Sequence, residues 1–127
     1  MNKVAVLLLL MPLLLQAVEW RSWEQGKTEA LKTGKKLLVA LVRDDCHYCH
    51  DMERAVFDDA DMSRRIEACF VPVKINLSVQ KAPFEARVPM TPTFVILRPD
   101  GTQVKTIPGS WNIPDFTELA MPACTKE

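Results

Sequence analysis

The chain has no excess of charge of either sign, and it has no basic or acidic run. Its 127 residues contain 16 Lys and Arg against 16 Asp and Glu, so the formal net charge is zero. This balance excludes the broad electrostatic attraction by which basic proteins bind nucleic acid or acidic membrane surfaces. We therefore expect no nucleic-acid partner.

The sequence also lacks an apolar run long enough to cross a bilayer as a helix. The longest run, residues 4–15, has about 12 residues, whereas a transmembrane helix needs roughly 20. The run follows Lys3 and ends near Ala17, a small residue of the kind that precedes a signal peptidase cut. No cysteine near its end would accept a lipid. We expect residues 1–17 to be a cleaved secretory signal peptide, with an uncleaved anchor as the alternative. Residues 18–127 would then form one periplasmic or secreted domain.

Helical and extended patterns alternate along that domain, without repeats or linkers. Apolar residues three or four apart predict helices, and short aliphatic runs or strict alternation predict strands. We expect helices at residues 20–33, 48–68, 78–87 and 113–121, and strands at residues 37–42, 70–77, 94–97 and 102–107.

Two local signals refine this assignment. In the second helix we expect a break near residues 58–61, where Asp59 or Asp61 is able to cap a new helical piece. Arg98-Pro99-Asp100-Gly101 is typical of a tight turn, so the last two strands should form a hairpin. The element order predicts an α/β fold: a central mixed sheet flanked by helices on both faces.

The position of one cysteine pair carries most of the functional information. Cys46-His47-Tyr48-Cys49 stands between a predicted buried strand and the first turn of a predicted helix. Unpaired N–H groups and the helix dipole favour a thiolate there, and a thiolate is the form that attacks disulfides. The spacing brings Cys49 within reach of a mixed disulfide formed by Cys46. We therefore predict a redox-active pair, with a structural bridge as the alternative, since exported proteins often carry disulfides.

Residues 20–121 resemble the thioredoxin superfamily. The resemblance rests on the aliphatic strand LLVALV, the CHYC motif after it, Thr91-Pro92-Thr93, the RPDG turn and Gly109. CHYCH followed by FVPVKIN is especially similar to thioredoxin-like families whose active site reads CHxCH.

This resemblance implies a thioredoxin-like fold and a thiol–disulfide oxidoreductase that reduces or isomerises protein disulfides. Cys46 would attack, Cys49 would resolve the mixed disulfide, and His47 would tune the thiolate. Pro92 matches the superfamily's cis-proline, which faces the cysteines. We expect Thr91, Pro92 and Tyr48 to contact substrate. The implied partners are disulfide-containing proteins and a membrane thiol reductant as electron donor. We expect a monomer.

Two positions depart from the thioredoxin pattern. Thioredoxins carry a buried acid six residues before the first cysteine, where this chain has Ala40, and a tryptophan just before that cysteine, where it has Asp45. A carboxylate at Asp45 would disfavour a neighbouring thiolate, whereas a protonated His47 would favour it. The sequence therefore leaves the redox direction open.

Other chemistries of these residues stay open as alternatives. Cys46 to His50 also matches the c-type haem attachment pattern, with His50 and either Met52 or Met90 as axial ligands. Copper(I) would suit the two sulfurs and a nearby His or Met. A long aliphatic strand before the motif fits a sheet protein better than a small cytochrome, which argues against haem. We expect no cofactor or metal.

The other two cysteines allow two interpretations. Cys69 is either a small buried apolar residue or the partner of Cys124 in a disulfide that fixes the C-terminal tail.

Overall fold

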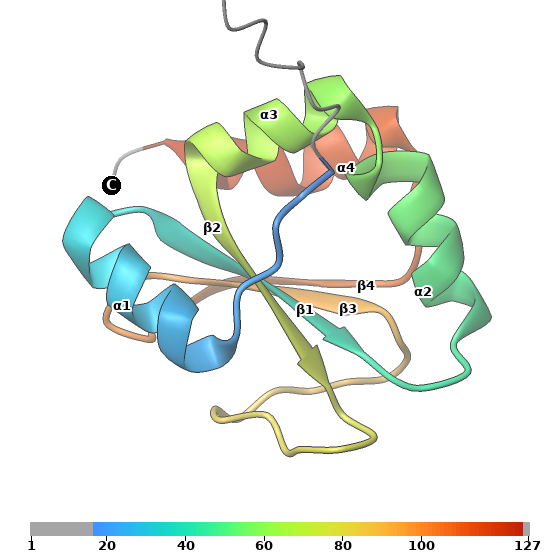
Figure 1. Ribbon diagram of the computed structural model, residues 1–127, viewed down its shortest axis with the longest axis horizontal. Helices are drawn as coiled ribbons and strands as arrows, with labels where there is room; N and C mark the ends of the chain where they lie inside the picture. Colours follow the sequence, from blue (N-terminus) through green and yellow to red (C-terminus); the bar gives the residue numbers. More distant parts are fainter. Residues whose placement is uncertain (1–16, 126–127) are drawn as a thin grey trace, which may run out of the picture.

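The computed structural model describes residues 17–125 and shows one sheet between two helical layers (Figure 1). The helices are α1 (Trp23–Thr33), α2 (His47–Met52), the π-helical turn η1 (Glu53–Phe57), α3 (Ala60–Cys69), α4 (Ile113–Ala120) and the 3-10 turn η2 (Met121–Cys124). The strands are β1 (Lys36–Val42), β2 (Phe70–Asn76), β3 (Thr93–Leu97) and β4 (Gln103–Pro108). Strand order is β2-β1-β3-β4, with β1 parallel to β2 and the other pairs antiparallel. The predicted mixed sheet is confirmed.

Strand β1 is central and buried on both faces, as its continuous aliphatic run predicts. Side chains alternate along a strand, so Leu38 and Ala40 face one layer while Leu37, Val39 and Leu41 face the other. The first layer consists of α2, η1, α3 and α4; α1 lies on the opposite face (Figure 1). Helices therefore cover both faces.

Helix α1 begins three residues later than predicted, because Ser22 and Gln25 form a capping box at its start. Before the helix, the chain runs along the edge of β2, where Arg21 pairs with Val73. Trp20, before the helix, packs against the core on the α3 side of the sheet, and Trp23, the first residue of α1, packs against the core on the opposite side. Burial alone would lower the pKa of the Arg21 guanidinium, but hydrogen bonds from it to Glu29 and Glu67 outweigh burial and raise that pKa.

The predicted break in the second helix is confirmed. The helix ends after η1, and Asp59 caps α3 by accepting the Met62 N–H at 2.9 Å.

The predicted helix at residues 78–87 is wrong. After a turn the chain is irregular, and the side chains of Ala82, Phe84, Ala86 and Val88 pack against the α1-side core. These apolar residues lie two apart, which is the period of an extended segment and not of a helix. The segment covers the part of the sheet that α1 leaves open.

The expected signal peptide, residues 1–17, falls almost entirely outside the described residues. Within residues 17–125, no helix has the length and apolar content that a membrane crossing requires.

Candidate active site

The end of strand β1 places Cys46 at the start of α2, where the sequence predicts it. Cys46 is the N-cap residue of α2, and its Sγ accepts the backbone N–H of Cys49 at 3.2 Å. The two sulfurs form a disulfide. Cys46 is only 9% exposed, so α2 and the surrounding loops cover most of it.

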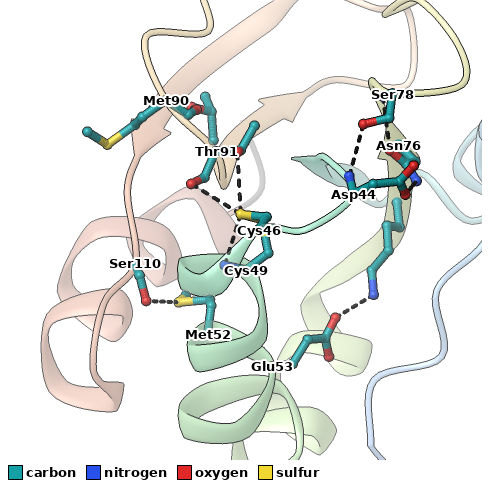
Figure 2. Close-up of a disulfide and its surroundings, with 12 residues drawn as sticks. Asp44, Cys46, Cys49, Met52, Glu53, Asn76, Ser78, Met90, Thr91 and Ser110 are labelled. Carbon is teal, nitrogen blue, oxygen red and sulfur yellow. Dashed lines mark hydrogen bonds and ion pairs between the residues drawn. A yellow bond between two sulfur atoms is a disulfide. The ribbon is translucent and has the colours of Figure 1, made fainter.

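The Thr91–Pro92 loop lies directly opposite Cys46 (Figure 2). Thr91 Oγ1 is 3.3 Å from the Cys46 sulfur and the Thr91 carbonyl oxygen is 3.5 Å from it. The Thr91–Pro92 peptide bond is cis. Two hydrogen bonds hold the loop in place: Gly109 N–H donates to the Pro92 carbonyl at 2.8 Å, and Thr93 Oγ1 donates to the Met90 carbonyl at 2.6 Å. In the reduced protein, the Thr91 hydroxyl and the Cys49 N–H are both placed to donate to a Cys46 thiolate.

His47 and Tyr48, between the two cysteines, point toward solvent. The His47 side chain is 80% exposed and its Nε2 lies 3.2 Å from Asp51 Oδ2 on the next turn. Its ring also contacts the Tyr48 ring edge to face. The structure thus places His47 against a carboxylate and not against a sulfur atom.

A cleft of about 370 Å³ opens beside Thr91. Its walls come from three segments: the start of α2, the loop before β3 and the loop between β4 and α4. The residues that line it are Tyr48, Met90, Thr91, Pro108, Gly109, Ser110 and Trp111. None of these side chains is charged. We call this feature the Trp111 cleft. It contains two of the three predicted substrate contacts, Tyr48 and Thr91, while Pro92 is buried behind it.

Sequence reasoning missed the hydrogen bond that the Met52 sulfur accepts. Met52 lies one turn after Cys49 and is 1% exposed. Its Sδ accepts the backbone N–H of Trp111 at 3.2 Å, and Ser110 Oγ points at the same sulfur from 4.0 Å (Figure 2). The sequence interpretation makes Met52 either an ordinary apolar residue of the helix or, in the haem alternative, an axial ligand.

An ion pair between Glu53 and Lys74 was also missed. Lys74 on β2 is the register partner of Ala40, and its Nζ binds the Glu53 carboxylate from the turn that follows Cys49. The ammonium group also lies 4.9 Å from the centroid of the Trp20 ring. A charged pair therefore lies beside Ala40, which occupies the position of the thioredoxin acid. The two side chains are about one-third exposed.

The loop before Cys46 is anchored to the end of β2. The Asp44 N–H donates to Ser78 Oγ at 2.9 Å, and Asn76 Nδ2 donates to Asp44 Oδ1 at 2.8 Å (Figure 2). Asp45 follows with φ of 53°, a conformation that aspartate tolerates better than most residues, and its side chain is exposed.

Cys69 and Cys124 form the second disulfide, at the other end of the parallel strands. Lys36 Nζ donates to the carbonyl oxygens of Ala123 and Thr125, so the tail is held at three points.

Within the described part of the chain, no three His, Cys, Asp or Glu side chains gather at a spacing that would hold a metal ion. The haem and copper(I) alternatives remain untested.

Comparison with known proteins agrees with this geometry. The family model described as a thioredoxin-like domain matches residues 23–121. A thioredoxin from Thermus thermophilus superposes with a TM-score of 0.72 at 28% identity, over 87% of this chain and 90% of that one.

Two further structures share the fold. The DsbH oxidoreductase gives a TM-score of 0.68 at 13% identity, over 86% of this chain and 85% of that one. The oxidised C-terminal domain of Neisseria meningitidis DsbD gives a TM-score of 0.62 at 13% identity, over 79% of this chain and 90% of that one.

Among curated sequences, human spermatogenesis-associated protein 20 is 31% identical over 60 residues, which are 46% of this chain. The match spans only 8% of the length of that human protein. The family model covers most of the chain, and the chain therefore belongs to the thioredoxin-like domain family, with a CxxC disulfide at the start of α2.

Proposed function

We propose that this protein is a thiol–disulfide oxidoreductase that reduces or isomerises disulfides in other proteins. One observation carries the proposal: the Cys46 sulfur lies at the start of α2, beside Cys49, and faces the Thr91–Pro92 loop. A sulfur with two donors aimed at it is stabilised as the thiolate. The adjoining Trp111 cleft gives a polypeptide room to approach that sulfur.

The reaction transfers two electrons in two exchange steps. The Cys46 thiolate attacks one sulfur of a substrate disulfide; that S–S bond breaks, and one substrate thiolate leaves. Cys49, as a thiolate, then attacks the Cys46 sulfur of the mixed disulfide. The second substrate thiolate leaves, the Cys46–Cys49 bond forms, and the substrate has been reduced. An external dithiol must then reduce the Cys46–Cys49 disulfide again.

Before the second step, the Cys49 thiol must lose its proton. Glu53 lies four residues after Cys49 and therefore on the same side of the helix, which makes it the candidate acceptor of this proton. Its carboxylate is held by Lys74 next to Ala40, on the face of the sheet that α2 covers. We propose that Glu53 accepts the proton, directly or through water, where thioredoxins use their strand acid.

We propose further that the protein acts as a monomer in the periplasm or secreted space, after removal of residues 1–17. In that compartment a membrane thiol reductant would donate electrons to the Cys46–Cys49 disulfide. Intact mass of the protein recovered from the producing cells should match a chain that begins at Val18. A full-length mass would contradict cleavage and favour the uncleaved anchor, whereas a protein retained in the cytosol would contradict export. Size-exclusion chromatography tests the monomeric state.

Substitution of the two active-site cysteines tests the mechanism. Cys46→Ser should abolish insulin reduction with dithiothreitol as donor, because the attacking thiolate is gone. Cys49→Ser should accumulate a mixed disulfide that mass spectrometry detects. The matched control is Cys69→Ser/Cys124→Ser, which removes the other sulfur pair and should retain activity. Activity retained by Cys46→Ser would disprove the proposal.

The equilibrium potential of the Cys46–Cys49 couple assigns the direction of electron flow. A reductase should have a value near about −270 mV, and an oxidant a value nearer −120 mV. Under the proposed function we expect a potential near the reductase value. A Soret band, or copper bound tightly after purification, would favour the alternative chemistries.

A further inference from the structure

We propose that Met52 is a positioning residue that sets substrate specificity, because its sulfur fixes the wall of the Trp111 cleft. This inference rests on the proposed oxidoreductase function and names a substrate class for it: extended polypeptides with an uncharged, apolar side chain next to the reacting cysteine.

One atom, the Met52 sulfur, connects helix α2 to the Trp111 cleft. Met52 lies three residues after Cys49, on α2, and its side chain is fully enclosed. The Trp111 N–H donates to Met52 Sδ at 3.2 Å, from the loop between β4 and α4. Among the described residues this N–H has no other acceptor, so the sulfur holds the loop against α2.

The position of that loop determines the shape of the cleft. Trp111 forms one wall, and its indole Nε1 donates to the Pro108 carbonyl at 3.1 Å, which fixes the ring once the backbone is fixed. Tyr48 and Met90 line other parts of the cleft; both are large apolar side chains and more than half exposed. Exposed apolar groups of this size around an open cleft are typical of a binding surface.

The chemistry of the cleft defines what it can bind. A volume of about 370 Å³ is enough for a large side chain, and no charged group lines the cleft. A charged substrate side chain would lose water there without gaining a partner. Thr91 lines the cleft and its hydroxyl lies 3.3 Å from the Cys46 sulfur, so we infer that the cleft holds the residue adjacent to the substrate cysteine.

Met52→Leu tests the positioning role, because leucine has similar volume but no sulfur acceptor. The Trp111 N–H then regains a partner only by moving toward water, which displaces the wall. Three disulfide substrates serve as probes: a peptide dimer with Leu beside cysteine, the same dimer with Glu there, and bis(2-hydroxyethyl) disulfide. We expect KM for the Leu peptide to rise about three- to tenfold, the effect of one lost neutral hydrogen bond, with kcat nearly unchanged. The other two substrates should show little change.

Met62→Leu is the matched control. Met62 is equally buried, and its sulfur also accepts weak contacts, from Arg65 and Thr117, but it lies on α3 away from the cleft. This variant should leave KM for all three substrates within about twofold of the parent.

Amide hydrogen exchange of the parent protein gives a second test that does not depend on a variant folding. The Trp111 amide should exchange slowly in the parent and faster in Met52→Leu. An unprotected Trp111 amide in the parent, or equal losses for all three substrates in Met52→Leu, would overturn the proposal. If the parent reduces none of the substrates, the proposed function fails, while amide exchange still reports on the Met52 contact.

Discussion

Gly26 is the residue at which helix α1 comes closest to strand β2. A Cβ added there would lie 2.1 Å from Val73 Cγ2, far inside van der Waals contact. Val73 is fully buried in a paired strand, and its branched side chain has little rotational freedom with which to withdraw. Close packing of α1 on the sheet therefore depends on this glycine.

We expect Gly26→Ala to lower the free energy of unfolding by about 1 to 2 kcal/mol. Alanine gains about 1 kcal/mol in helix propensity, but overpacking a rigid contact costs about 1 to 3 kcal/mol, and at this separation the upper end applies. Urea denaturation measures the difference. Lys32→Ala, at an exposed position of the same helix, should change stability by less than about 0.5 kcal/mol. A stabilised Gly26→Ala protein would show that α1 does not pack this closely.

At the residue scale, local motifs predicted some of the site and missed the rest. Cys46, Cys49, Thr91 and Pro92 were recognisable because their spacing and neighbours follow a known pattern. The Met52 contact joins residues 59 apart in sequence, and the Lys74 pair depends on the register between β1 and β2. Neither contact produces a periodic pattern or a bias in composition, so the sequence alone does not predict the Met52–Trp111 hydrogen bond or the Glu53–Lys74 ion pair.

At the scale of elements, the β3–β4 hairpin carries a titratable group in its turn. Asp100 accepts hydrogen bonds from the Thr102 hydroxyl and from the Thr102 N–H, the latter at 2.9 Å. These two bonds lower the pKa of the Asp100 carboxyl below its ordinary value of 3.8, and the bond from the Thr102 hydroxyl has the larger effect. Because the folded pKa is depressed, the turn gains stability above the ordinary pKa and loses it as pH falls through the folded pKa.

We expect the Thr102 amide resonance to titrate with a midpoint below 3.8. In Asp100→Asn, which keeps an acceptor oxygen but does not ionise, this titration should vanish. NMR spectra recorded between neutral and strongly acid pH provide the measurement. A midpoint at or above the ordinary aspartate value would contradict the lowered pKa.

The helices and strands were predictable wherever the apolar residues follow a single spacing or a local capping signal is present. Strand β1 and the Asp59 cap follow from local sequence, and both are confirmed. The helix predicted at residues 78–87 is absent because the apolar residues that this segment buries lie two apart, which is the spacing of an extended chain.

At the scale of the whole molecule, the Cys69–Cys124 disulfide joins α3 to the C-terminal tail across 55 residues of chain. Cys69 is buried, and Lys36 binds the tail carbonyls beside the bridge. The sequence left this pairing open, because four cysteines allow three connectivities and proximity depends on the fold.

We expect Cys69→Ser/Cys124→Ser to reduce the free energy of unfolding by about 2 to 4 kcal/mol, since the unfolded chain loses a cross-link. Insulin reduction per folded molecule should stay unchanged. Thermal denaturation and the insulin assay measure the two quantities side by side. An unchanged melting temperature would show that the bridge adds nothing to the fold.

The two sulfur pairs lie at opposite ends of the parallel strands, Cys46 beyond the carboxyl end of β1 and Cys69 just before the first residue of β2. A seven-residue strand spans about 20 Å, so no sulfur of one pair can reach the other while the sheet is intact. Scrambling within a single molecule is therefore blocked by distance alone. In the proposed mechanism, the Cys46–Cys49 dithiol can therefore open and close through many turnovers while the tail stays cross-linked.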